Sequence, residues 1–170
     1  YNFVDDHDVA RIYNKLNNKA HFAPVHVLLY TLPGKPSIYY GSEFAIEGEK
    51  MSYSDDNLRP ELKFEDYKDA DKNNDYTKLI KALGNMRLSN PWLGEATYRE
   101  LLLTNRQYAF LREYGDRRLI AIVNNDDNNA DIHLNVSGEF KELFSGEVRN
   151  FDGNMNVNIA GNSGQVWIGV

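Results

Sequence analysis

The sequence predicts an α/β part followed by an all-β part. In the first part, short apolar runs end in polar, acidic residues and are separated by helical stretches. In the second part, short runs rich in β-branched and aromatic residues alternate with turn residues. The pattern changes near residues 90–95, which divides the chain into residues 1–92 and residues 93–170.

Composition limits the classes of protein to which the chain can belong. Its 170 residues are 42% hydrophobic, enough for packed cores, and its net charge is -6. This negative charge opposes the general attraction to phosphate on which non-specific nucleic-acid binding depends, so we expect no nucleic-acid partner. No apolar run reaches the roughly 18 to 20 residues that cross a bilayer, so we expect no membrane partner.

Cysteine is absent from the sequence. The chain can therefore build neither a disulfide framework nor a cysteine-rich zinc site. This fits a cytoplasmic protein and is also compatible with secretion. The chain opens on a strand-like run without Met, as if it were cut from within a larger protein, and any signal peptide would then be missing.

The first part follows a strand, helix, strand order. Residues 1–4 resemble a short buried strand, and four polar residues, Asp5 to Asp8, follow it directly. Residues 20–32 carry apolar side chains at helical spacing and end at Pro33-Gly34. Residues 37–40 predict a second short strand, which Gly41 ends.

A long polar excursion and a second helix complete the first part. Residues 42–74 are rich in Asp, Glu and Lys without clear periodicity, and loops of this length usually serve a site. Residues 75–88 have the spacing of an amphipathic helix, with Asp75 or Thr77 as its cap.

Short strands at regular spacing predict an antiparallel β-sandwich in the second part. The expected strands are residues 98–103, 107–114, 119–123, 130–134, 140–144, 155–159 and 165–168. We expect Phe110, Tyr114 and Trp167 to pack in its core. Trp92, beside Pro91, is expected to fill the junction between the two parts.

Asp8 is the first candidate for chemistry, with His7 as a hydrogen-bond donor beside it. Parallel α/β folds place their active sites at the carboxyl ends of strands, which is where these two residues are expected. The alternative is that both residues cap the following helix, because Asp is a favoured N-cap residue. The residues alone leave both interpretations open.

An incomplete calcium-loop pattern begins at Asp69 and continues with Asp71, Asn73 and Asp75. Asn74 replaces the turn glycine of such a loop, and Ile80 stands where its bidentate Glu belongs. A solvated loop that leads into a helix is the better interpretation. We expect no metal site and no cofactor.

Two ordered motifs resemble the alpha-amylase family of glycoside hydrolases. Residues 3–8 (Phe-Val-Asp-Asp-His-Asp) are similar to the segment in which an aromatic strand ends in Asn-His-Asp, on the seventh strand of a (β/α)8 TIM barrel. Residues 32–43 look like the eighth-strand segment. Residues 56–60 look like a loop of oligosaccharide-acting members, and residues 91–123 are similar to the start of the C-terminal sandwich. The resemblance implies the last two βα units of the barrel followed by an antiparallel β-sandwich.

The resemblance also implies roles for individual residues. Asp8 would be catalytic, because it would bind the substrate hydroxyls and favour the distorted, oxocarbenium-like sugar ring. His7, Arg11 and Tyr40 would be substrate-binding. Arg11 could form a salt bridge near the site or lie on the surface. Tyr39 and Tyr40 should face opposite ways if they alternate along a strand, so at most one should reach the site.

Retaining glycoside hydrolysis needs two further carboxylates, about 5 Å apart, as nucleophile and as acid/base. The resemblance places both before Tyr1, so we expect the chain alone to be inactive. Its expected partners are an alpha-glucan oligosaccharide and the missing N-terminal part of the barrel. Residues 1–4 and 37–40 should either associate with a second copy of the chain or be poorly packed. The alternative function is a carbohydrate-binding or structural β-sandwich module without catalysis.

Overall fold

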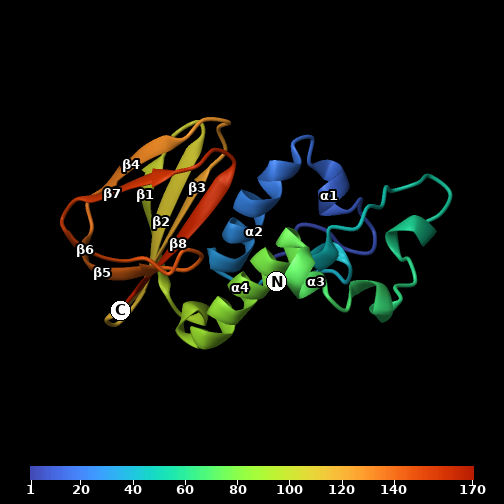
Figure 1. Ribbon diagram of the computed structural model, residues 1–170, viewed down its shortest axis with the longest axis horizontal. Coiled ribbons are helices and arrows are strands. Elements are labelled where there is room, and N and C mark those ends of the chain that lie inside the picture. The colour runs from blue at the N-terminus through green and yellow to red at the C-terminus, as the bar shows by residue number, and fades with distance from the viewer.

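A computed structural model describes all residues, 1–170, and shows a helical part beside a two-sheet part (Figure 1). The helices are α1 (Ile12–Lys15), α2 (Phe22–Thr31), α3 (Ala70–Asn73) and α4 (Asp75–Ser89). The strands are β1 (Thr97–Leu103), β2 (Gln107–Tyr114), β3 (Arg117–Asn124), β4 (Ala130–Leu134), β5 (Ser137–Glu142), β6 (Val148–Asp152), β7 (Met155–Ile159) and β8 (Ser163–Gly169). None of the helices has both the length and the apolar character needed to cross a membrane.

The strands form the antiparallel sandwich that the sequence predicts. A six-stranded sheet has the order β1-β2-β3-β8-β5-β6, and β4 and β7 form a second sheet of two strands. Every pair within the two sheets is antiparallel. Strand β6, where Phe151 is the only buried residue, was not predicted from the sequence. Strand β5 begins at Ser137, earlier than the predicted residues 140–144.

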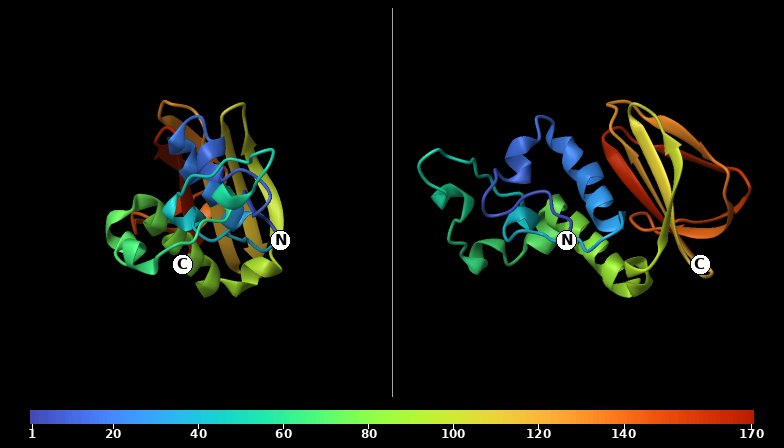
Figure 2. Two further views of the ribbon diagram at one scale, coloured as in Figure 1. Left: turned by 90° about the vertical axis from the view of Figure 1, so that its right-hand side faces the viewer. Right: turned by 180° about the vertical axis from the view of Figure 1, so that it is seen from behind.

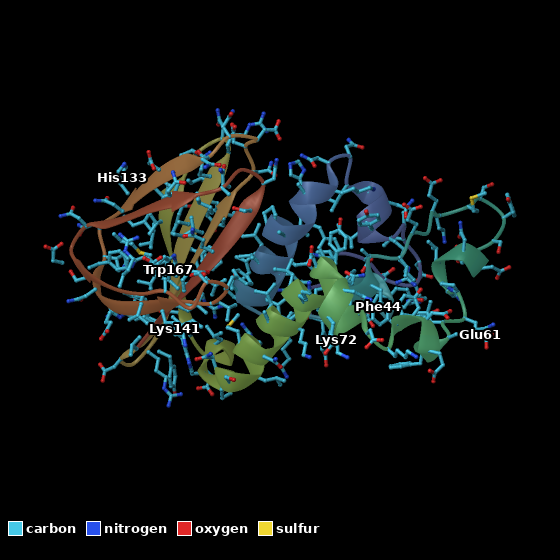
Figure 3. All side chains as sticks on the ribbon, viewed as in Figure 1. Phe44, Glu61, Lys72, His133, Lys141 and Trp167 are labelled. Carbon is cyan, nitrogen blue, oxygen red and sulfur yellow. The ribbon has the colours of Figure 1, made fainter.

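The central sheet buries side chains on both of its faces. On β2, Ala109 and Leu111 face β4 and β7, whereas Phe110 faces the helices. The run from Leu119 to Asn124 on β3 is buried at every position, which is typical of a strand covered on both sides. Trp167 on β8 lies within the sandwich, as Figure 3 shows, and is 1% exposed.

Helix α2 packs on the outer face of this sheet, against β3 and β8, and α4 packs against α2 (Figures 1 and 2). The same core contains Val27 of α2, Leu83 of α4, and Trp92 from the turn Pro91–Gly94. Gly164 of β8 permits this close contact, since a Cβ atom there would lie 2.8 Å from Cγ2 of Val27. Trp92 therefore packs at the junction between the helices and the sheet.

The buried side chain of Arg112 ties the helices to the sandwich. From β2, its guanidinium donates hydrogen bonds of 2.7 to 3.0 Å to four backbone carbonyls, those of Thr31, Leu93, Ala96 and Thr97. Burial lowers the pKa of Arg112, and the positive charge of Arg87 lowers it further. An arginine still remains charged at neutral pH, so the bonds are charge-assisted.

The two strands expected at residues 1–4 and 37–40 do not form. A single parallel bridge joins Asn2 and Pro36, with Asn2 N–H donating to Lys35 and Ser37 N–H donating to the Asn2 carbonyl, both at 2.8 Å. Residues 1–4 and 37–40 have no other strand beside them, and a single bridge is too short to form a β-ladder. Residues 1–96 therefore form no sheet and no barrel strands.

The two expected helices are confirmed as α2 and α4, with one correction at a cap. Asn74, not Asp75 or Thr77, caps α4, because its side-chain oxygen accepts hydrogen bonds from the amides of Tyr76 and Thr77. Phe110 and Trp167 are buried as expected. Tyr114 is 47% exposed because it ends β2 beside the turn at Gly115, so its predicted core position is wrong.

We expect Arg112→Met to lower the free energy of unfolding by roughly 3 kcal/mol or more, because it leaves several buried carbonyls without a donor. Urea denaturation of the whole chain measures this change. Arg117→Met, at an exposed position at the start of β3, is the matched control and should change stability by less than about 0.5 kcal/mol. A loss below about 1 kcal/mol in Arg112→Met would contradict the role given to this side chain.

Candidate functional site

Asp8 and His7 lie together on the surface of the helical part. Their side chains are 59% and 58% exposed, and His7 Nε2 is 3.1 Å from Asp8 Oδ2. The other Asp8 oxygen, Oδ1, accepts a hydrogen bond of 3.0 Å from Arg59. Asp8 is therefore an accessible carboxylate with a defined partner on each oxygen.

Asp5, not Asp8, anchors this segment to the fold. Its side chain is buried, and Oδ2 accepts hydrogen bonds from Ile12 N–H at 2.8 Å and from the Ser42 hydroxyl at 2.7 Å. Asp8 and His7 make no such bond to the start of α1, so their interpretation as helix caps is wrong. Asp6 Oδ1 accepts a hydrogen bond of 2.8 Å from the backbone N–H of Asp8, so the Asp6 side chain acts here only as an acceptor.

Arg11 is fully buried and makes no salt bridge, which corrects both expectations for it. Its guanidinium donates to the carbonyls of Tyr40 (2.6 Å) and Leu58 (2.7 Å) and to Ser42 Oγ (3.3 Å). Burial leaves it no surface for a sugar, so Arg11 positions the neighbouring segments and is not the substrate-binding residue we expected.

Tyr39 and Tyr40 lie on the same side of the chain, against Arg11. The Arg11 guanidinium carbon is 4.2 Å from the ring centre of Tyr39 and 5.2 Å from that of Tyr40. The two rings meet edge to face, 4.8 Å apart. The expected alternation fails because residues 37–40 are not a strand. Tyr40 is 42% exposed and donates to the Pro60 carbonyl, while the Tyr39 ring is 6.4 Å from that of His7.

Arg59, which was not predicted as a site residue, joins the long loop to Asp8. Besides Asp8, its side chain contacts the His7 carbonyl at 3.3 Å and Asp55 at 3.5 Å. A hydrogen bond from Lys50 lowers the pKa of Asp55, and the charges of Lys50 and Arg59 act in the same direction. One signal was available, because Arg59 is the only arginine in residues 42–74.

The arrangement offers one exposed carboxylate, one imidazole and two tyrosine rings at one corner of the molecule. Such groups can bind sugar hydroxyls and stabilise positive charge, but a single carboxylate does not supply both a nucleophile and a proton donor. The structure forms no group of three or more potential metal ligands. In the incomplete calcium loop, Asp69, Asp71 and Asp75 each pair with a lysine.

Comparison with known proteins supplies the family. Residues 103–168 match the family described as Alpha amylase, C-terminal all-beta domain. The chain is 27% identical to a cyclomaltodextrin glucanotransferase of Bacillus sp. (strain 1-1), over 97% of the chain and 24% of that protein. It is 30% identical to a cyclomaltodextrinase of Thermoanaerobacter pseudethanolicus, over 79% of the chain and 22% of that protein. The chain thus spans about a quarter of the length of these relatives.

A solved structure agrees with the fold. The crystal structure of an Anoxybacillus alpha-amylase superposes with a TM-score of 0.82 at 21% identity, covering 99% of this chain and 37% of that one. The antiparallel sandwich and the family match at residues 103–168 define the class as a C-terminal all-beta domain. The chain belongs to the alpha-amylase family, and its strands form that family's C-terminal all-beta domain. The substrate roles of Asp8, His7 and Tyr40 stay predictions.

His26, near Asp5, should make stability depend on pH. It is fully buried on α2, its Nδ1 bonds to the Phe22 carbonyl, and its Nε2 has no partner. Burial lowers its pKa below the ordinary 6.5, against the raising effects of the Phe22 bond and of Asp5. Neutral His26 is therefore favoured in the folded state. Its contribution to the free energy of unfolding is full above about pH 6.5, the pKa in the unfolded chain, and is lost as the pH falls through the lower pKa of the folded state.

The test compares free energies of unfolding at about pH 7.5 and about pH 5. Replacing His26 with Gln, which does not titrate, should reduce the loss of stability on acidification. His133→Gln, at an exposed position on β4, is the control and should keep the wild-type pH dependence. An unchanged pH dependence in His26→Gln would show that His26 does not act in this way.

Arg59→Ala should loosen the long loop without unfolding the chain. The ion pairs it makes are exposed, so we expect a global loss below about 1 kcal/mol. The amides of residues 50–60 should nevertheless exchange faster with deuterium, because the link to Asp8 is gone. Lys63→Ala, an exposed change in the same loop, is the control. Equal exchange in the two variants would argue against a tethering role for Arg59.

Proposed function

We propose that the chain is part of a retaining glycoside hydrolase that acts on alpha-glucosidic bonds of maltodextrin-like oligosaccharides. The observation that carries the proposal is the exposed carboxylate of Asp8, held between His7 and Arg59. The names of the relatives, cyclomaltodextrinase and cyclomaltodextrin glucanotransferase, favour the same class of substrate.

Residues 1–92 would then supply the last two βα units of a (β/α)8 barrel. The parallel bridge between Asn2 and Pro36, with α2 between its two sides, supports this order. Parallel neighbours need such a crossover connection. Tyr1 and Phe3 are 91% and 55% exposed, which favours a further contact at this edge with the upstream barrel or with a second copy.

Asp8 would act on the transition state rather than as nucleophile. Its carboxylate would bind the hydroxyls of the sugar at the cleavage position and stabilise the positive charge that develops on the ring. His7 would donate a hydrogen bond to the same sugar, and Tyr40 would contact it with its exposed ring. Arg11 and Asp5 would hold these groups in place from beneath. Without the other two carboxylates, the chain alone would not turn over a glycoside.

The alternative of a sugar-binding sheet face has less support. Trp167 is 1% exposed and cannot offer its ring. Tyr98 of β1 and Tyr114 of β2 are 41% and 47% exposed and stand on different strands. The central strands of the sheet are also covered on both faces.

Joining the chain to the upstream segment of a cyclomaltodextrinase relative should give maltodextrin turnover. In that protein, Asp8→Asn should lower kcat by about a hundredfold or more, because it removes charge stabilisation made in the transition state. Asp116→Asn, in the exposed turn after β2, is the matched control and should keep full turnover. Full turnover with Asp8→Asn would contradict the role proposed for this carboxylate.

A further inference from the structure

Two adjoining hollows lie at the junction between the α1–α2 connection and the loops of the sandwich. They have volumes of about 240 and 270 Å³, and Arg106 and Asn125 line both, so they form one groove. The α1–α2 connection and the β3–β4 loop lie on the same side of the molecule, at the top of Figure 1. Neither hollow contains Asp8, His7 or Arg59. The groove is therefore separate from the candidate site.

Three polar side chains in the groove have no partner inside the chain. His21, Arg106 and Asn125 come from three different segments, and only their backbone groups take part in hydrogen bonds. No ion pair joins Arg106 to the carboxylates of Asp126 and Asp127, which line the same hollow. The side chains of His21, which is half-buried, and of Arg106 and Asn125, which are exposed, are therefore free to bind a ligand.

The loop that carries these acceptors is held in one shape. Asn124 is fully buried, and its amide group donates to the carbonyls of Asn128 and Ala160. Asp126 Oδ1 accepts both the backbone and the side-chain N–H groups of Asn128, which lowers the pKa of Asp126. A loop fixed in this way loses little entropy when a ligand binds.

The other half of the groove has an apolar wall. Val25 and Leu28 of α2 face Tyr108 of β2 across it. The Tyr108 ring packs 5.3 Å from that of Phe110, and its hydroxyl bonds to the hydroxyl of Tyr98. An apolar surface beside convergent polar groups suits a sugar, which has apolar ring faces and a rim of hydroxyls.

Charge favours a neutral ligand. One arginine faces two aspartates in the polar half, so an anion would meet a net negative charge when His21 is neutral. We propose that this groove is a second binding site for a short alpha-glucan oligosaccharide, with its rings along Tyr108 and its hydroxyls on His21, Arg106 and Asn125. The groove is independent of Asp8, but the choice of an alpha-glucan rests on the proposed function.

Titration of the whole chain with maltotriose, followed by backbone amide NMR, tests the proposal. We expect saturable shifts at residues 21, 107 and 125. The combined change His21→Ala and Arg106→Ala should weaken this binding by at least about tenfold, since it removes hydrogen bonds from two donors. Arg99→Ala, an exposed arginine on β1 outside the groove, is the matched control and should bind like the wild type.

The same titration separates the two sites. Asp8→Asn should leave the shifts in the groove unchanged, whereas shifts at residues 7, 8 and 59 report on the candidate site by themselves. A chain without saturable shifts in the groove, or with shifts that survive His21→Ala and Arg106→Ala, would overturn the proposal. Shifts with inorganic phosphate but not with maltotriose would overturn it as well.

Discussion

The helices of this chain have no sheet of their own, and the outer face of the sandwich completes their core. Val27 and Leu83 pack with Phe110, Leu119 and Val166 in one continuous cluster. The single bridge at Asn2 contributes little beside that burial, which is worth about 25 cal/mol per Å² of apolar surface. The positions of α2 and α4 therefore depend on the central sheet.

The backbone around Asp8 is held in place by buried groups beneath it rather than by the ion pairs of Asp8 itself. Exposed pairs such as Asp8 with Arg59 contribute on average less than about 1 kcal/mol. Hydrogen bonds to buried charged groups contribute roughly 1.5 to 3 kcal/mol each, and Asp5 and Arg11 make several. The fold thus keeps Asp8 accessible while fixing the backbone on which it stands.

Local patterns predicted much of this fold. The bounds of β2, β4 and β7 could be read from short runs rich in β-branched and aromatic residues between turn signals, and those of α2 and α4 from helical spacing and their end signals. Strand β6 was missed because its residues 148–152 are mostly polar. The strands at residues 1–4 and 37–40 were over-predicted because a strand needs partners, which a local pattern does not show.

The site was less accessible to sequence reasoning. Asp8, His7 and Tyr40 were singled out by a motif, and the structure places all three at the same corner. Arg59 and Arg112 act on residues far away in the sequence, so nothing in their neighbourhood indicates their contacts. Arg11 was expected to bind substrate but is buried. The local sequence does not show which distant segments pack over an arginine.

Native-state hydrogen exchange tests most directly whether the helices depend on the sheet. If they do, the slowest amides of α2 and of β3 should exchange with the same free energy of opening and the same dependence on denaturant, because they belong to one cooperative unit. The contrary result is that α2 exchanges through a separate opening of clearly lower free energy while β3 stays protected. The helices would then not form one cooperative unit with the sheet, which would contradict their dependence on it.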